Sequence, residues 1–133
     1  VYDIPGKVSV HWLAEVRSIL DTWTTYSVSL EEFRTAVLEK GLVYAKANNG
    51  QAYIVDSSKA VGVFSKEIQD FIGTDIFPSF AENGIKYFIT INAEAPVTRL
   101  TVKTYQAKAG PHGLKLVEAD STENAIEWLK NNA

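Results

Sequence analysis

The chain has 133 residues, of which 46% are hydrophobic and 22% are charged, and its formal net charge is −3. This composition is that of one ordinary globular domain, and it argues against a disordered chain and against a general nucleic-acid binder. Cysteine is absent, which excludes disulfides, zinc–thiolate sites and cysteine nucleophiles, and no apolar run approaches the roughly 18 residues of a membrane span.

Two strands are predicted near the beginning of the chain. Residues 8–12 alternate between apolar and polar side chains, and residues 17–24 are rich in Ile, Leu, Thr and Trp. Residues 13–16 are few enough to join the two strands as a hairpin. We therefore expect an antiparallel pair at one edge of the sheet.

A helix and a central strand are predicted next. Ser29 and Glu32 have the spacing of a capping box, in which each side chain binds the other residue's backbone N–H. Apolar side chains then recur at helical spacing, at Leu30, Phe33, Val37 and Tyr44. Gly41 weakens this helix by roughly 1 kcal/mol relative to alanine, and the Asn-Asn-Gly run at 48–50 ends it. Residues 52–55 are apolar on both faces, which is typical of a strand at the centre of a sheet.

The most hydrophobic helix is predicted to begin after Ser65. Its apolar side chains recur at helical spacing, at Phe64, Ile68, Phe71, Ile72, Ile76 and Phe80. Pro78 is expected to kink this helix or to mark a new turn. The dipeptide Asn83-Gly84 is expected to end it.

The last third of the chain predicts two strands and two helices. Residues 85–91 form a strong strand candidate. Residues 96–108 fit two structures, because a proline at the start suits a helix, whereas residues 100–104 alternate as in a strand; we choose the helix. Residues 114–117 predict the final strand, and a second capping box at 120–123 predicts the start of the last helix.

These elements follow the order β-β-α-β-α-β-α-β-α. Strands that alternate with helices imply βαβ crossovers and a mostly parallel sheet, to which the hairpin adds an antiparallel edge. Pro and Gly are scattered along the chain and do not separate two domains. We therefore predict a single α/β domain over residues 1–133, with a mixed sheet of four to five strands and four helices.

Six short motifs lie along the chain in the order of a known fold. They are Trp23, Ser29-Leu30-Glu31-Glu32-Phe33, Val55-Asp56, Phe77-Pro78, Gly84-Ile85-Lys86 and Ala125-Ile126-Glu127-Trp128-Leu129. Together they resemble the STAS fold of bacterial anti-sigma-factor antagonists, and more closely the stand-alone STAS/SEC14-type bacterial proteins. The resemblance covers nearly the whole chain and implies a regulatory or protein-interaction module without chemistry of its own.

The residues that leave the predicted central strand are the first candidate site. Asp56, Ser57, Ser58 and Lys59 lie at the carboxyl end of that strand, where ligands gather in open α/β sheets. They are therefore candidates for contact with a ligand or a partner.

The resemblance also implies a serine in this region that a partner kinase phosphorylates. Counted from Asp56 this serine falls on Ser65, and Ser58 matches a second serine of the family pattern. The aspartate that precedes the serine in the family is Phe64 here, and the small residues after it are replaced by charged ones. The alternative is that Ser65 only caps its helix.

An acid-free stretch from residue 95 to residue 117 is the second candidate site. Its cationic side chains are Arg99, Lys103, Lys108, His112 and Lys115. If residues 96–108 are helical, Arg99 and Lys103 lie one turn apart on one face and could hold a phosphate or a carboxylate. The alternative is a solvated helix face, and the cations are too few for nucleic-acid binding.

The residue pattern supports no other chemistry. His11 and His112 each stand alone, without the spacing of a metal site. The sequence holds no Gly-x-Ser-x-Gly elbow and no phosphate-binding glycine loop. We therefore expect no catalytic site, no metal and no cofactor.

Two functions remain in view. The first is a STAS-type regulatory or interaction module with a phosphorylation switch at Ser65 or Ser58, whose partner is another protein or a second copy. The second is a SEC14-like protein that binds a lipid or a small apolar or anionic ligand beneath the hydrophobic helix 64–80. The apolar width of that helix also favours a homodimer. The lack of cysteine favours the cytoplasm, and because Val1 is not methionine we expect the sequence to begin inside the encoded protein.

Overall fold

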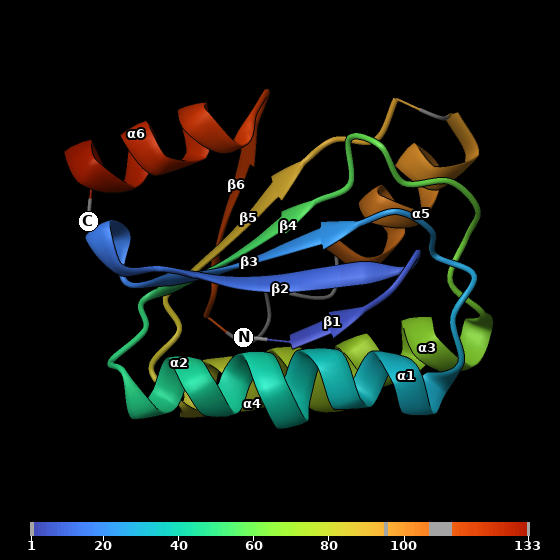
Figure 1. The fold of residues 1–133 in the computed structure, drawn as a ribbon, viewed down its shortest axis with the longest axis horizontal. Helices are drawn as coiled ribbons and strands as arrows, with labels where there is room; N and C mark the ends of the chain where they lie inside the picture. Colours follow the sequence, from blue (N-terminus) through green and yellow to red (C-terminus); the bar gives the residue numbers. More distant parts are fainter. Residues whose placement is uncertain (1, 95, 107–112, 133) are drawn as a thin grey trace.

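A mixed sheet of six strands forms the centre of the structure, and its strands lie side by side in chain order (Figure 1). The computed structural model describes residues 2–94, 96–106 and 113–132. The strands are β1 (Tyr2–Ile4), β2 (Val8–Leu13), β3 (Ser18–Trp23), β4 (Ala52–Asp56), β5 (Tyr87–Ile91) and β6 (Lys115–Ala119). The strands β1 to β3 pair antiparallel, and β3 to β6 pair parallel.

The strand β1 corrects the predicted count of four to five strands. It has three residues, with Tyr2 opposite Val10 and Ile4 opposite Val8 of β2. Three residues are too few for a period of two to show in a sequence. The α/β class, the mixed sheet and the four helices agree with the prediction, and the element order becomes β-β-β-α-β-α-β-α-β-α.

In the described part of the chain, four helices connect and follow the strands (Figure 1). Their segments are α1 (Leu30–Arg34), η2 (Thr35–Leu42) and α2 (Val43–Ala47), then α3 (Lys66–Phe71), η3 (Ile72–Ile76) and α4 (Phe77–Glu82), then α5 (Pro96–Gln106), and last α6 (Thr122–Asn132). We call residues 30–47 the first long helix and residues 66–82 the second long helix. The middle segments η2 and η3 are π-helical, a geometry that is frequent at functional sites. A single 3-10 turn, η1 (Ala14–Val16), joins β2 and β3.

Serine side chains cap three of the four helices. Ser29 and Glu32 exchange the two hydrogen bonds of the predicted capping box, at 3.0 and 2.9 Å. Ser65 accepts a hydrogen bond at 3.2 Å from the backbone N–H three residues later. At the last helix the cap is Ser121, which accepts a hydrogen bond at 3.1 Å in the same way. This cap lies one residue later than the predicted box at 120–123, because α6 begins one residue later.

The sequence left alternatives open for residues 96–108 and for Pro78, and the structure decides both. The segment that fitted a helix or a strand is the helix α5, over Pro96–Gln106, and residues 107 and 108 of the predicted helix lie outside the described residues. Pro78 lies in the first turn of α4, directly after the π-helical segment η3. Ile76 and Phe77 before it have right-handed helical dihedral angles, so the second long helix continues through the proline. Pro78 therefore marks the change from the π-helical to the α-helical segment inside that helix, and not the start of a separate helix.

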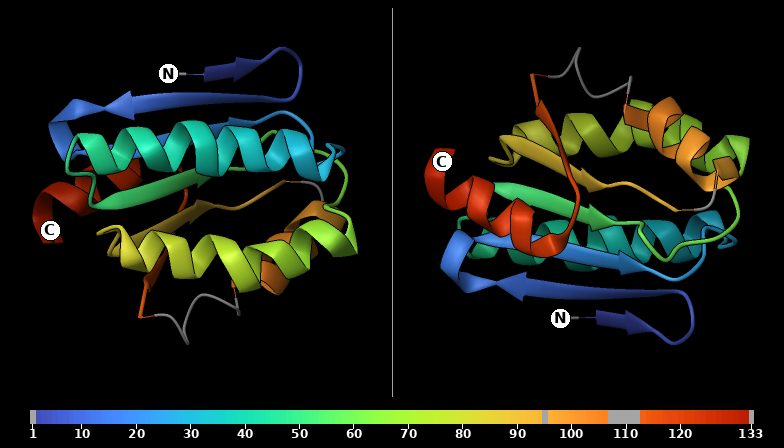
Figure 2. Two further views of the ribbon diagram at one scale, coloured as in Figure 1. Left: turned by 90° about the horizontal axis from the view of Figure 1, so that it is seen from below. Right: turned by 90° about the horizontal axis from the view of Figure 1, so that it is seen from above.

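Helices cover both faces of the sheet, with the two long helices on one face and α6 on the other (Figure 2). Because side chains alternate along a strand, β3 directs Ile19, Asp21 and Trp23 to the face that the two long helices cover, and Leu20 to the other face. The larger hydrophobic core lies under the two long helices, and a smaller one lies under α6. Val102 of α5 belongs to the larger core.

Candidate functional site

One carboxylate organises the loop that leaves the central strand β4. Oδ1 of Asp56, the last residue of β4, accepts hydrogen bonds from the backbone N–H of Ser58 at 3.0 Å and from its hydroxyl at 2.7 Å. Oδ2 of Asp56 accepts a hydrogen bond at 3.3 Å from the hydroxyl of Thr122 at the start of α6. Both oxygens are thus used within the protein, and they tie the loop and the last helix to the sheet.

The two other predicted residues of this loop have different surroundings. Ser57 is fully buried, and its hydroxyl shares a hydrogen bond with the buried hydroxyl of Tyr26. Lys59 is exposed, and its Nζ lies 3.6 Å from a carboxylate oxygen of Glu94 beyond β5. Ser57 therefore belongs to the core, whereas Ser58 and Lys59 reach the surface.

Ser65 lies at the far end of the same loop, where the second long helix begins. It is exposed, although its hydroxyl also caps that helix. Val61 and Val63, which precede it, are 56% and 44% exposed. The loop therefore presents an exposed serine and two exposed valines together at the carboxyl edge of the sheet.

Arg99 and Lys103 lie one turn apart on α5, but they contact different groups of the protein. The Nε of Arg99 donates a hydrogen bond at 3.0 Å to the carbonyl of Ala93. Lys103 forms an ion pair with Glu118 of β6. The structure therefore does not bring the two cations together around a shared anion site. Lys108 and His112 lie outside the described residues.

Asp21 is a buried acid that the sequence analysis did not single out. It lies in β3, and its Oδ2 accepts a hydrogen bond at 2.7 Å from the hydroxyl of Tyr53 in β4. Its Oδ1 has no hydrogen-bond partner among the described residues. Burial raises the pKa of Asp21 from 3.8 to about 8, and the hydrogen bond from Tyr53 opposes this shift only in part. Asp21 is therefore mostly protonated in the folded protein at neutral pH.

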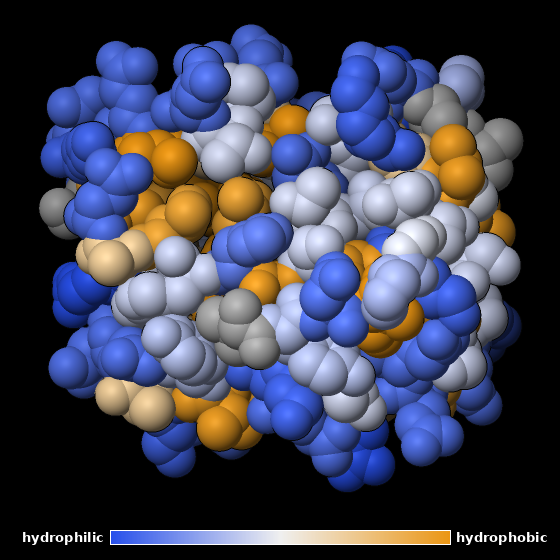
Figure 3. Space-filling model, viewed as in Figure 1, coloured by the Kyte–Doolittle hydropathy of each residue, from blue (hydrophilic) through white to orange (hydrophobic). Residues whose placement is uncertain are grey.

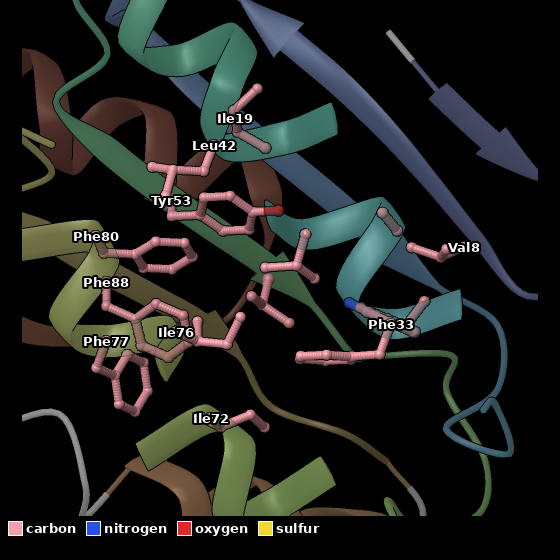
Figure 4. Packing of buried hydrophobic residues seen from close by; sticks show 14 of the residues in the cluster. Val8, Ile19, Phe33, Leu42, Tyr53, Ile72, Ile76, Phe77, Phe80 and Phe88 are labelled. Atoms are coloured by element: carbon pink, nitrogen blue, oxygen red, sulfur yellow. The ribbon is translucent and has the colours of Figure 1, made fainter. Parts of the chain in front are cut away.

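Asp21 and Tyr53 line a small cavity between the sheet and the two long helices. Its volume is about 30 Å³, which is room for one or two water molecules. The remaining lining is apolar and consists of Trp23, Phe33, Val37, Val55, Phe64, Ile72, Ile76, Phe77, Phe80 and Phe88. Figure 4 shows the ring of Tyr53 beside Phe80 and Phe88 in this part of the core. Among the described residues, the Asp21 side chain thus receives one hydrogen bond, from Tyr53, in largely apolar surroundings.

The hydroxyl of Tyr53 also reaches the first long helix at Gly41. A Cβ atom on Gly41 would lie 2.4 Å from the oxygen of that hydroxyl, which is far inside contact distance. The ring of Tyr53 cannot easily yield, because it stacks on Phe80 with 4.5 Å between the ring centroids. The glycine that weakens the helix in the sequence pattern is therefore the point at which the helix accommodates a side chain of the sheet.

One signal in the sequence could have revealed this acid. Asp21 lies in a strand at a position that shares a face with Ile19 and Trp23, both of which are large and apolar. Aspartate is depleted in strands, and burial of a carboxyl group is costly. The contacts with Tyr53 and Gly41 leave no such signal, because they join separate elements.

Removal of the Asp56 carboxylate is expected to weaken the loop after β4. The variant Asp56→Ala loses three hydrogen bonds and leaves the N–H of Ser58 without its acceptor. We expect it to lower the free energy of unfolding by about 1 to 2 kcal/mol. Urea denaturation measures this, with Lys59→Ala as the control, because its exposed ion pair is worth less than about 1 kcal/mol. Equal stability of the two variants would show that Asp56 does not organise the loop.

Comparison of the chain with known proteins identifies no relative. No protein-family model, no curated protein and no solved structure matches the chain. Within the described part of the chain, no group of His, Asp and Glu side chains could hold a metal ion. None of the described helices combines the length and the apolar character that are needed to cross a membrane.

Proposed function

We propose that this protein is a STAS-type regulatory module, without catalytic activity, that binds a protein partner through the loop between Asp56 and Ser65. The observation that carries the proposal is the joint exposure of Val61, Val63 and Ser65 on this loop. Exposed apolar side chains can contact a partner protein. A phosphate on the neighbouring serine would add negative charge to that contact and change the affinity. The hydrogen bonds of Asp56 to Ser58 and Thr122 support the proposal, because they tie the start of this loop to the sheet and to α6.

The surroundings of the two candidate serines favour Ser65 as the switch. A phosphate on Ser65 would lie at the start of the second long helix, where backbone N–H groups and the helix dipole stabilise negative charge. A phosphate on Ser58 would face the carboxylate of Asp56, to which the Ser58 hydroxyl now donates. Repulsion between these two anions would open the loop. Phosphorylation at Ser65 is therefore compatible with the folded loop, whereas phosphorylation at Ser58 is not.

Two parts of the earlier expectation lose support in the structure. Of the apolar side chains from which a homodimer was expected, Phe64, Ile72, Ile76, Phe77 and Phe80 are buried in the core and Phe71 is half-buried. On the face of the molecule shown in Figure 3, hydrophobic residues form separate patches among hydrophilic ones. The cavity of about 30 Å³ is far smaller than the roughly 300 Å³ or more of ordinary ligand sites, so it does not favour a lipid. We therefore propose a protein partner, and the absence of cysteine in the chain favours the cytoplasm as the place of contact.

The switch at Ser65 is tested with variants that add charge without removing the cap. Aspartate caps a helix about as well as serine, so Ser65→Asp is expected to leave stability unchanged and to lower partner recovery at least about tenfold, because the added charge disfavours an apolar contact. Ser29→Asp is the matched control, because Ser29 is also an exposed N-cap serine. The measurement is quantitative mass spectrometry of proteins that co-purify with the tagged chain, together with the phosphorylation state of Ser65 and Ser58.

We expect Ser29→Asp to behave as the wild type, and Val61→Ser combined with Val63→Ser to lose the same partner as Ser65→Asp. Ser65→Ala separates charge from capping, because it removes about 1 kcal/mol of cap energy without adding charge. The proposal fails if Ser65 carries no phosphate under any growth condition and all these variants recover the same proteins.

A further inference from the structure

Three groups connect the sheet to the first long helix in the larger core. Asp21 of β3 accepts a hydrogen bond from the hydroxyl of Tyr53 at 2.7 Å, and that hydroxyl lies against Gly41 of η2. Gly41 lies in the π-helical segment Thr35–Leu42, where the backbone departs from α-helical geometry. The position of the Tyr53 hydroxyl therefore depends on Asp21 on one side and limits the position of the helix backbone on the other.

Tyr53 is the one titratable side chain that faces Asp21 from the described elements around the cavity. The first long helix contributes Phe33 and Val37, and the second contributes Ile72, Ile76, Phe77 and Phe80. The strands contribute Trp23, Val55 and Phe88, and the loop before α3 contributes Phe64. A negative charge on Asp21 would thus have the Tyr53 hydroxyl as its hydrogen-bond donor, and no cationic side chain is among the described residues that line the cavity. Burial, which disfavours the charged form of Tyr53, and the neighbouring Asp21 both raise the pKa of Tyr53 well above its ordinary value, so Tyr53 keeps its proton and remains a hydrogen-bond donor.

The cavity beside Asp21 gives space in which water could solvate an ionised Asp21 carboxylate. It has room for one or two water molecules, and Oδ1 of Asp21 has no partner among the described residues. An ionised carboxylate in apolar surroundings is costly until water or a donor reaches it. The first long helix forms one wall of the cavity, so its displacement is a direct way to admit more water.

We propose that Asp21 and Tyr53 form a proton-sensitive latch that sets how firmly the first long helix docks on the sheet. While Asp21 is protonated, the cavity stays small and the Tyr53 hydroxyl holds its place between Asp21 and Gly41. When Asp21 loses its proton, the cavity takes up water and the Tyr53 hydroxyl moves with the ionised carboxylate. The first long helix then packs less tightly on the sheet at η2. The raised pKa of Asp21, about 8, places this change at mildly alkaline pH.

The latch is tested by following Asp21 and the helix separately in the intact chain. Carbon-13 NMR of the Asp21 carboxyl reports its ionisation, and hydrogen exchange of the amides of η2, corrected for the intrinsic rate, reports docking. We expect the carboxyl to titrate near pH 8 and the protection of the η2 amides to fall at least about tenfold through the same range. Amides of β4 are expected to keep their protection, because the strand lies inside the sheet.

Two variants distinguish a latch from general alkaline unfolding. Tyr53→Phe removes the hydroxyl that connects Asp21 to Gly41, so Asp21 is expected still to titrate, at a higher pH because it has lost this donor, while the η2 amides respond less than in the wild type. Tyr44→Phe is the matched control, because Tyr44 lies on the same helix and is exposed; it is expected to respond as the wild type. The latch is excluded if the Asp21 carboxyl does not titrate below about pH 10, if the η2 amides do not follow it, or if Tyr53→Phe keeps the full response. None of these readings depends on a variant of Asp21, so they hold even if Asp21→Asn does not fold.

Discussion

The stability of the wild-type protein is expected to fall as the pH rises from about 4 to about 8, and the variant Asp21→Asn is expected to lack this loss. The slope attributable to Asp21 is about 1.4 kcal/mol per pH unit. Over the whole range the difference between the two proteins is expected to change by several kcal/mol. This is a large share of the total stability of an ordinary domain.

The direction of this effect follows from where the proton is held. In the unfolded chain Asp21 ionises near its ordinary pKa of 3.8, whereas in the folded protein it keeps its proton up to about 8. Folding therefore takes up a proton between these two values, and the contribution of the neutral acid, complete below about pH 4, is lost as the pH rises. Above about pH 8 both states are ionised and the loss is complete.

Urea denaturation at several pH values measures the difference. The amide that Asp21→Asn introduces would accept the Tyr53 hydrogen bond through its carbonyl oxygen, so the packing of the site is kept while the titration is removed. Asp75→Asn is the control, because Asp75 is exposed, and its curve is expected to run parallel to that of the wild type. Parallel curves for Asp21→Asn and the wild type would show that Asp21 does not keep its proton on folding.

The variant Gly41→Ala is expected to destabilise the protein by about 2 to 3 kcal/mol, although alanine is the better helix former. In an exposed helix the same change stabilises by about 1 kcal/mol. Here the new Cβ would lie 2.4 Å from the hydroxyl oxygen of Tyr53, and overpacking of a core costs about 1 to 3 kcal/mol. Displacement of that hydroxyl also takes the hydrogen-bond donor away from the buried Asp21, at a further cost of about 1 to 3 kcal/mol.

A double-mutant cycle isolates the contact between these two residues. In a Tyr53→Phe background the hydroxyl is absent, so Gly41→Ala is expected to cost about 1 to 2 kcal/mol less than it does in the wild type. Part of the cost remains, because the Cβ would still lie 3.2 Å from Cε2 of the ring. Chemical denaturation of the four proteins gives the coupling energy. Additive effects would mean that the hydroxyl of Tyr53 does not limit the helix at Gly41.

Both predictions depend on Tyr53, although neither concerns the loop that carries the proposed partner site. The loop is held by Asp56 at the carboxyl edge of the sheet, whereas Asp21 and Tyr53 lie in the core beneath the two long helices. Variants at Ser65 and at Asp21 can therefore be interpreted independently. Failure of the switch at Ser65 would leave the latch untouched, and the reverse also holds.

Local patterns in the sequence were sufficient for most of the secondary structure. Ser29 with Glu32 marks the first helix, because a capping box satisfies backbone groups through residues three positions apart. The apolar run at 52–55 marks the central strand, because a strand that is buried on both faces cannot alternate. Such signals act over one turn or one strand, so they are visible without the rest of the chain. The strand β1 was missed because its three residues are too few to form a pattern.

The arrangement of the candidate site was decided by tertiary structure. The sequence by itself placed Asp56, Ser58 and Ser65 on one loop, because they follow one strand within ten positions. It could not show that Lys103 forms an ion pair with Glu118, because these two residues lie on different elements. Nor could it show that Arg99 binds a backbone carbonyl and does not share an anion with Lys103.

The buried acid is the clearest case of what only the packed fold determines. The sequence analysis noted Gly41 as a weak point of the first helix and did not single out Asp21 in its strand. Packing of the first long helix on the sheet brings both to the hydroxyl of Tyr53 and leaves a cavity beside the carboxyl. The raised pKa of Asp21 follows from that desolvation, which depends mainly on side chains that separate strands and helices bring to the carboxyl.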